Sequence, residues 1–120
     1  MKDLAIQKDR ALRREADATI ELSETVAHMA GYLDGRGQGP KDGSLKGIML
    51  TVNGRIKAQF GLPIKEMDPA TLDTVALLKR DLARLIIRMM ADRADYPEMK
   101  RKMWDLIKRS ESEHFHKWSA

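Results

Sequence analysis

The stretch from Asp68 to Asp92 constrains the fold more than any other part of this 120-residue chain. Asp68 is a good helix N-cap, and Pro69 suits the first helical position because the N–H it lacks would have no partner there. At about 100° per residue, the apolar side chains of this stretch cover an arc of roughly 200°. They are Leu72, Val75, Ala76, Leu78, Leu82, Ala83, Leu85, Ile86, Ile87, Met89 and Met90. One neighbour cannot cover so wide an arc, so we expect a central helix at 68–92 that touches at least two other helices or a second subunit.

Two further segments carry narrower apolar stripes at helical spacing. The segment at 3–33 predicts a long N-terminal helix whose first two turns project beyond the core, and the segment from Pro97 onward predicts a C-terminal helix. The seam of the first is Leu12, Ala16, Thr19, Leu22, Val26, Met29 and Leu33. The stripe of the second is Met99, Met103, Leu106, Ile107 and Ser110, with Trp104 at its border. A glycine-rich loop at 34–43 ends the first helix.

The segment 47–60 supports two interpretations. Asn53-Gly54 between alternating apolar residues is a strong hairpin signal, but a two-residue turn would pair an apolar face with a polar one. Read as a helix with Ser44 as N-cap, the segment gathers its apolar side chains within about 120°. Those side chains are Leu45, Ile48, Met49, Val52, Ile56 and Phe60. We therefore favour a helix, and the β-hairpin remains the alternative.

These segments together predict an all-α fold, a four-helix antiparallel bundle-like single domain over residues 1–120, with a C-terminal tail at 111–120 that is free to fray. The length suits one domain. No cysteine is present, which excludes disulfides, thiolate nucleophiles and cysteine-based zinc sites. No apolar run is long enough for a membrane span and no signal-peptide core is visible, so we expect a cytoplasmic protein. The wide central arc favours a homodimer.

Positive charge is concentrated in the middle and at the end of the chain. The formal net charge is +4. Clustered lysines and arginines attract phosphate backbones and acidic surfaces, so we expect a non-enzymatic binding or regulatory module that engages nucleic acid or an acidic protein. Aromatic side chains among lysines in the C-terminal helix add stacking surfaces. The candidate contact residues are Arg36, Lys41, Lys46, Arg55, Lys57, Lys65, Arg80, Arg84, Arg88, Lys100, Trp104, Lys108, Lys117 and Trp118.

The histidines near the C-terminus do not predict a metal site. His114 and His116 lie about 200° apart on a helix, so one ion cannot bind both. The spacing of Glu111 with His114 occurs in di-iron bundles, but those sites also need a second Glu-x-x-His and two further glutamates from facing helices. The segment from Leu45 to Phe60 has no acidic residue and the central helix has only aspartates, so the set cannot be completed. We therefore expect no metal and no cofactor.

A hydrolase is the alternative function. Glu21 and Glu24 lie one helical turn apart, and two such carboxylates can share Mg²⁺ with substrate phosphates. All-α nucleotide pyrophosphohydrolases begin with such a pair but need a second acidic pair on a later helix, where this chain offers only Asp73 and Asp81. Half of that pattern is missing, so the chain is not assigned to that family. A third hypothesis is a structural or adaptor subunit that binds a protein through an apolar helical surface.

Two features of the central helix have a structural and a functional interpretation. Lys79 falls inside the apolar arc, where a lysine either pairs with a carboxylate, extends its ammonium to water, or serves as a base. Arg80, Arg84 and Arg88 form a row that could follow phosphates, but nearby aspartates favour a salt-bridged surface.

Overall fold

The part of the chain that the structure describes folds into four α-helices. The computed structural model describes the backbone of residues 2–38 and 44–119 and the side chains of 3–38 and 44–110. The helices are α1 (Lys2–Gly35), α2 (Leu45–Phe60), α3 (Pro69–Ala91) and α4 (Tyr96–Ser119), and a short 3₁₀ helix, η2 (Ile64–Glu66), lies between α2 and α3. The described residues contain no strand. The all-α prediction is confirmed, and the segment 47–60 is helical rather than a hairpin.

The helix starts follow from local capping. The Ser44 hydroxyl accepts a hydrogen bond from the N–H of Gly47 at 3.2 Å, as predicted for the start of α2. The carboxylate of Asp68 accepts from the N–H of Thr71 at 2.8 Å at the start of α3. These side chains satisfy donors that have no partner inside the helix, which fixes where each helix begins.

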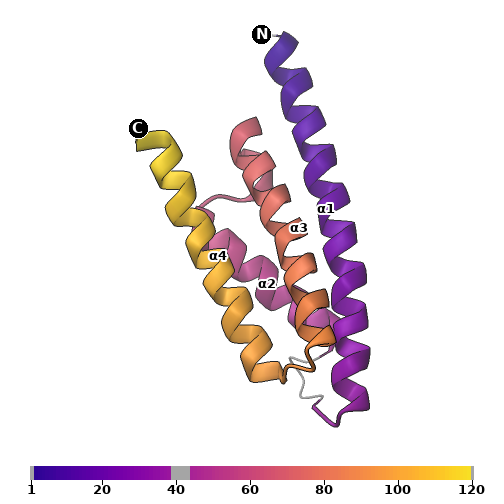
Figure 1. Cartoon of the computed structure of the whole chain (residues 1–120). Coiled ribbons are helices and arrows are strands. Elements are labelled where there is room, and N and C mark those ends of the chain that lie inside the picture. The colour runs from indigo at the N-terminus through magenta and orange to yellow at the C-terminus, as the bar shows by residue number, and fades with distance from the viewer. Residues whose placement is uncertain (1, 39–43, 120) are drawn as a thin grey trace.

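Consecutive helices run antiparallel, and this alternation makes α1 and α3 parallel (Figure 1). The α1–α3 contact is the most extensive in the molecule, while α3 also packs on α4, and α2 crosses α1 and α4 obliquely. Two contacts confirm that α1 and α3 are parallel. Arg14 pairs with Asp73 in the N-terminal half of both helices, and Tyr32 near the end of α1 contacts Ala94 just after α3. The molecule is therefore a four-helix bundle whose most extensive helix contact joins two parallel helices, α1 and α3.

The central position of α3 is confirmed. Ten of its residues are buried, and they face both α1 and α4. Every member of the predicted arc is buried or half-buried except Ile87, which is 56% exposed. The buried stripes of the other helices pack on α3 or beside it, and they include Leu22, Val26, Met29, Leu33, Ile48, Val52, Ile56, Met99, Met103 and Ile107.

The predicted seam of α1 is wrong in its N-terminal half. Ala16 is exposed and Leu12 and Thr19 are only half-buried, whereas Ala11, Glu15 and Ala18 are buried. The apolar pattern alone predicts an exposed Glu15, because charged side chains are rarely buried without a partner. Here a partner exists, because Lys79 of α3 lies opposite. The buried stripe of α1 therefore runs one residue earlier than the apolar pattern alone suggests.

The first turns of α1 project beyond the start of α3, as expected (Figure 1). Leu4 and Ile6 in this segment are 64% and 49% exposed. A membrane-spanning helix, which would have to be both long and strongly apolar, is not found in the described part of the chain.

Candidate functional site

The predicted contact residues lie on several separate surfaces of the structure. Arg55, Trp104 and Lys108 lie together where α2 meets α4. Arg80 and Arg84 lie with acidic residues on the α1–α3 side. The remaining candidates are distributed over the ends of the bundle and the outer surfaces. The side chains of Lys41, Lys117 and Trp118 lie outside the described residues.

The α2–α4 edge, defined here as Arg55, Gln59, Trp104 and Lys108, combines a flat aromatic surface with positive charge. The guanidinium carbon of Arg55 lies 4.4 Å from the ring centroid of the half-buried Trp104. The side-chain amide of Gln59 donates to the carbonyl of Lys108 at 3.2 Å. Gln59 follows Arg55 by four residues on α2, and its partner Lys108 follows Trp104 by four residues on α4, so the two helices are parallel at this edge. The cation–π stack therefore lies between two helices rather than on a loop.

Nothing acidic on α2 offsets its positive charge. Between Leu45 and Phe60 the helix contains Lys46, Arg55 and Lys57, all exposed, and no aspartate or glutamate. Arg55 and Lys57 lie on different flanks, since Arg55 reaches Trp104 whereas Lys57 lines a pocket against α1 and α3. The predicted patch on α2 is therefore split between two sides of the helix.

A shallow hollow of about 550 Å³ lies on α4 and shares Lys108 with the α2–α4 edge. Its lining contains three cations and one carboxylate. They are Lys102, Lys108, Arg109 and Asp105, with Leu85 of α3 at the side. Lys102 also meets Glu98 at 3.3 Å. The surplus of positive charge thus continues from the edge along α4.

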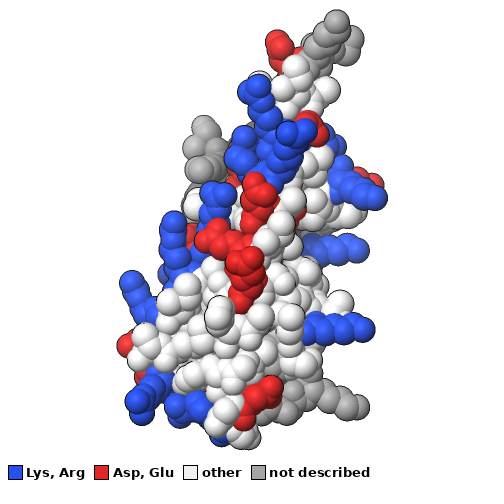
Figure 2. Space-filling view, turned by 90° about the vertical axis from the view of Figure 1, so that its right-hand side faces the viewer, with Lys and Arg blue, Asp and Glu red and all other residues white. Residues whose placement is uncertain are grey.

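The α1–α3 side is, by contrast, internally neutralised. Arg80 lies 3.7 Å from Glu21, and Arg84 lies 3.5 Å from Asp81. Arg14 donates two hydrogen bonds to Asp73, at 2.9 and 3.2 Å, and this hydrogen bonding raises the pKa of Arg14 above its ordinary value. Figure 2 shows basic and acidic groups side by side on this face, above a largely uncharged lower half. The salt-bridged interpretation is confirmed for Arg84 with Asp81, whereas Arg80 pairs with Glu21 of α1 rather than with an aspartate of its own helix.

Two further candidates lie over aromatic rings where α1 ends and α4 begins. The guanidinium of Arg36 lies 5.3 Å from the ring centroid of Tyr32, and the ammonium of Lys100 lies 4.6 Å from that of Tyr96. Arg36 directly follows the last residue of α1. Lys100 and Trp104 lie on the same helix, α4, with Lys100 one turn before Trp104.

The last three candidates make no common site. Lys65 lies in η2, where its carbonyl accepts from the ammonium of Lys8 at 2.9 Å. Lys46 and Arg88 are exposed on α2 and α3 respectively.

The carboxylates named for the alternative hydrolase are engaged with arginines. Glu21 faces Arg80, and the two later candidates, Asp73 and Asp81, face Arg14 and Arg84. Glu24 is exposed on α1. Among the residues that the structure describes, no group of three or more acidic, histidine or cysteine side chains could hold a metal ion. No observation therefore favours Mg²⁺ binding at Glu21 and Glu24.

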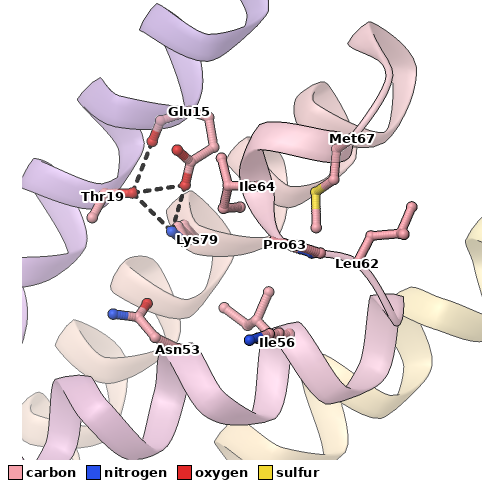
Figure 3. A pocket seen from close by; sticks show the side chains of 10 residues that line it. Glu15, Thr19, Asn53, Ile56, Leu62, Pro63, Ile64, Met67 and Lys79 are labelled. Atoms are coloured by element: carbon pink, nitrogen blue, oxygen red, sulfur yellow. Dashed lines mark hydrogen bonds and ion pairs between the residues drawn. The ribbon is translucent and has the colours of Figure 1, made fainter.

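Sequence reasoning missed a pocket of about 390 Å³ between α1, α2, α3 and the segment that joins α2 to α3 (Figure 3). At its floor the ammonium of Lys79 donates to Oε1 of Glu15 at 2.5 Å and to the hydroxyl of Thr19 at 2.8 Å. The Lys79 and Glu15 side chains are only 5% and 8% exposed. The apolar arc of the central helix singles out Lys79, but it does not identify the partner. The signal available was the position of Glu15 in the series Ala11, Glu15, Ala18 and Leu22, spaced by four, three and four.

No protein-family model matches this chain, and neither the curated proteins nor the solved structures contain a significant match to it.

Proposed function

We propose that this chain is a non-enzymatic binding module whose α2–α4 edge engages single-stranded nucleic acid. The observation that carries the proposal is the Arg55 guanidinium stacked at 4.4 Å on Trp104. Proteins that bind single strands without sequence preference combine an aromatic surface for the bases with cations for the backbone. The edge offers both on rigid helices, and the proposal includes a cytoplasmic site of action.

Charge supports this surface over the other faces. An arginine that already faces a carboxylate must give up that partner to meet a phosphate, whereas α2 contributes cations from a helix with no acidic residue. The hollow beside Lys108 extends the positive surface by Lys102 and Arg109. A strand lying along α4 would thus meet the Trp104 ring and then a row of cations.

The test is fluorescence anisotropy of a labelled single-stranded oligonucleotide at increasing salt. With three phosphates contacted by Arg55, Lys108 and Arg109, the affinity falls roughly 20-fold between 50 and 200 mM salt. Arg55→Ala and Lys108→Ala each weaken binding and reduce the salt dependence. Trp104→Leu weakens binding but leaves the salt dependence unchanged, because stacking releases no counterions.

Arg84→Ala is the matched control, since Arg84 faces Asp81 on the neutralised side. It leaves the affinity unchanged. Absence of binding at low salt, or an Arg84→Ala effect as large as that of Arg55→Ala, contradicts the proposal. A polyglutamate peptide that binds as well as the oligonucleotide, with no effect of Trp104→Leu, identifies an acidic protein surface as the partner instead.

We also propose that the chain forms a homodimer. Large apolar side chains are exposed on three helices, and they include Ile20 (58%), Leu50 (64%), Leu77 (56%) and Ile87 (56%). Burying them in a second copy would remove apolar surface from water. Sedimentation equilibrium over a wide concentration range is expected to show a dimer, and a monomer throughout contradicts this part of the proposal.

A further inference from the structure

We infer that the pocket above the Lys79–Glu15 pair binds a small neutral amphiphile, that is, an aliphatic molecule whose single head group both donates and accepts a hydrogen bond. The pocket runs from solvent to the core. Lys57, Leu62 and Pro63 are exposed at its mouth, while Ile56 and Met67 are buried. Figure 3 shows the Lys79–Glu15–Thr19 cluster on one side and the aliphatic side chains on the others.

The walls select an apolar body. The aliphatic surface comes from Ile56, Leu62, Pro63, Ile64 and Met67, and none of the described residues that line the space is aromatic. Small-molecule sites of 300–1,000 Å³ have this composition, with a few polar groups that orient the ligand. At about 30 Å³ per water-sized volume, 390 Å³ accommodates a ligand of roughly a dozen non-hydrogen atoms.

The floor selects the head group. An ammonium has three N–H donors, and two of those of Lys79 go to Glu15 and Thr19. One donor is left for a ligand. The second carboxylate oxygen of Glu15, Oε2, accepts no hydrogen bond from the described residues, and no buried side-chain oxygen or nitrogen among them lacks a partner. Oε2 is therefore not sealed in the core. The third N–H of Lys79 and Oε2 of Glu15 thus give the pocket floor one donor and one acceptor side by side.

Charge then decides between ligand classes. The charges of Lys79 and Glu15 cancel at 2.5 Å, so the floor is neutral. A ligand carboxylate would be brought beside Glu15, and a ligand ammonium beside Lys79, and like charges in a desolvated site repel. A primary amide or an alcohol meets both groups without adding a charge. The side-chain amide of Asn53, on the α2 side of the pocket, offers the head group a second donor and acceptor.

The experiment is an NMR titration of the isotope-labelled full chain with octanamide, octanoate and octylamine, in the absence of nucleic acid. Octanamide is expected to shift the backbone amides around the pocket and to bind on the order of tenfold more tightly than either charged analogue. Octanoate binding more tightly than octanamide overturns the neutral head group. Absence of specific shifts with all three probes overturns the site.

Ile64→Phe tests the location, because Ile64 lines the pocket and is half-buried there. The added ring volume should abolish octanamide binding. Ile6→Phe makes the same change at an exposed position in the first turns of α1, outside the pocket, and should leave binding intact. If Ile64→Phe binds octanamide like the unmodified chain, the amphiphile sits elsewhere and the inference is wrong.

The double variant Glu15→Leu with Lys79→Met tests the head group. It removes both charges together and should abolish the preference for octanamide over octanoate while the apolar walls remain. Because Ile64→Phe keeps the buried pair, the inference stays testable whatever the double variant does to folding. Oligonucleotide binding at the α2–α4 edge is measured separately, so failure of one proposal does not imply failure of the other.

Discussion

The ammonium of Lys79 and the carboxylate of Glu15 meet at 2.5 Å between α1 and α3, although 64 positions separate them in the sequence. Both side chains are more than nine-tenths buried, and Thr19 completes the cluster by accepting from Lys79. Removing two charges from water costs several kcal/mol per ion, and close pairing with good hydrogen bonds offsets that cost. The pair therefore ties together the two helices that make the largest contact in the fold.

Lys79→Met is expected to destabilise the protein by about 3–5 kcal/mol, because it leaves the Glu15 carboxylate buried without a counter-charge. Urea denaturation followed by circular dichroism measures the loss. The control is Arg14→Met, which breaks the ion pair with Asp73, where both side chains are about half exposed. Exposed ion pairs contribute little, so the control should change the free energy of unfolding far less.

The double variant Glu15→Leu with Lys79→Met should recover most or all of that loss, since apolar replacements of a buried ion pair are often neutral or stabilising. A double variant no more stable than Lys79→Met alone contradicts this account. It would mean that the polar cluster cannot be exchanged for apolar packing at this position.

Helix positions could be predicted from the sequence because their signals are local. Ser44, Asp68 and Pro69 marked the starts of α2 and α3, and the apolar period identified the buried face of α3. The orientation of the N-terminal half of α1 could not be predicted in the same way. It depends on Glu15 being buried, and that depends on Lys79 lying opposite in a parallel helix, which no local pattern encodes.

Gly54→Ala is expected to stabilise the protein by about 0.5–1 kcal/mol, because glycine inside a helix loses more backbone entropy on folding than alanine. Apart from the adjacent residues and the backbone of α2 itself, no atom of the described residues would lie within 4 Å of a side-chain carbon added at Gly54, so no clash opposes the gain. Thermal and urea denaturation measure the change in stability.

Gly61→Ala is the matched control for that variant. Gly61 ends α2 with φ +72°, and apart from its two chain neighbours no atom of the described residues would lie within 4 Å of a carbon added there. Only the backbone conformation differs, so alanine at Gly61 should destabilise the protein by about 1 kcal/mol. Stabilisation by both variants would show that the left-handed conformation at Gly61 carries no penalty.

The candidate sites were less predictable than the helices. Trp104 and Arg55 were each identified as candidate contact residues, but their stacking depends on the crossing of α2 and α4, which neither helix alone determines. The pocket beside Lys79 depends on four segments, including the connection that holds η2. The charge composition shows where cations are abundant along the chain. It does not show that Arg80 and Arg84 are neutralised, because their ion pairs depend on the fold.

Tyr32→Phe is expected to cost about 1 kcal/mol, because the Tyr32 hydroxyl donates to the carbonyl of Ala94 at 2.9 Å and connects the end of α1 to the turn between α3 and α4. The phenyl ring keeps the apolar packing. Hydrogen exchange should show faster opening of the amides around Ala94 than of those in the middle of α3. A uniform change across the chain would contradict a local connection.

Arg93→Gly is expected to stabilise the protein by about 0.5–1 kcal/mol. The end of α3 has the hydrogen bonds of a Schellman motif, with the N–H of Ala94 donating to Met89 and that of Arg93 to Met90, and it places Arg93 at φ +57°. The end of α1 has the same arrangement, but there the left-handed position is Gly37, at φ +69°. Arginine carries a steric penalty in this conformation that glycine does not.

Arg93→Ala separates the backbone from the charge, because alanine removes the guanidinium but keeps the side-chain carbon that is strained. It should give none of the gain seen with glycine, and Gly37→Ala should destabilise the protein by about 1 kcal/mol. Equal stabilisation by Arg93→Ala and Arg93→Gly in urea denaturation would place the cost in the charge of Arg93 rather than in its left-handed backbone.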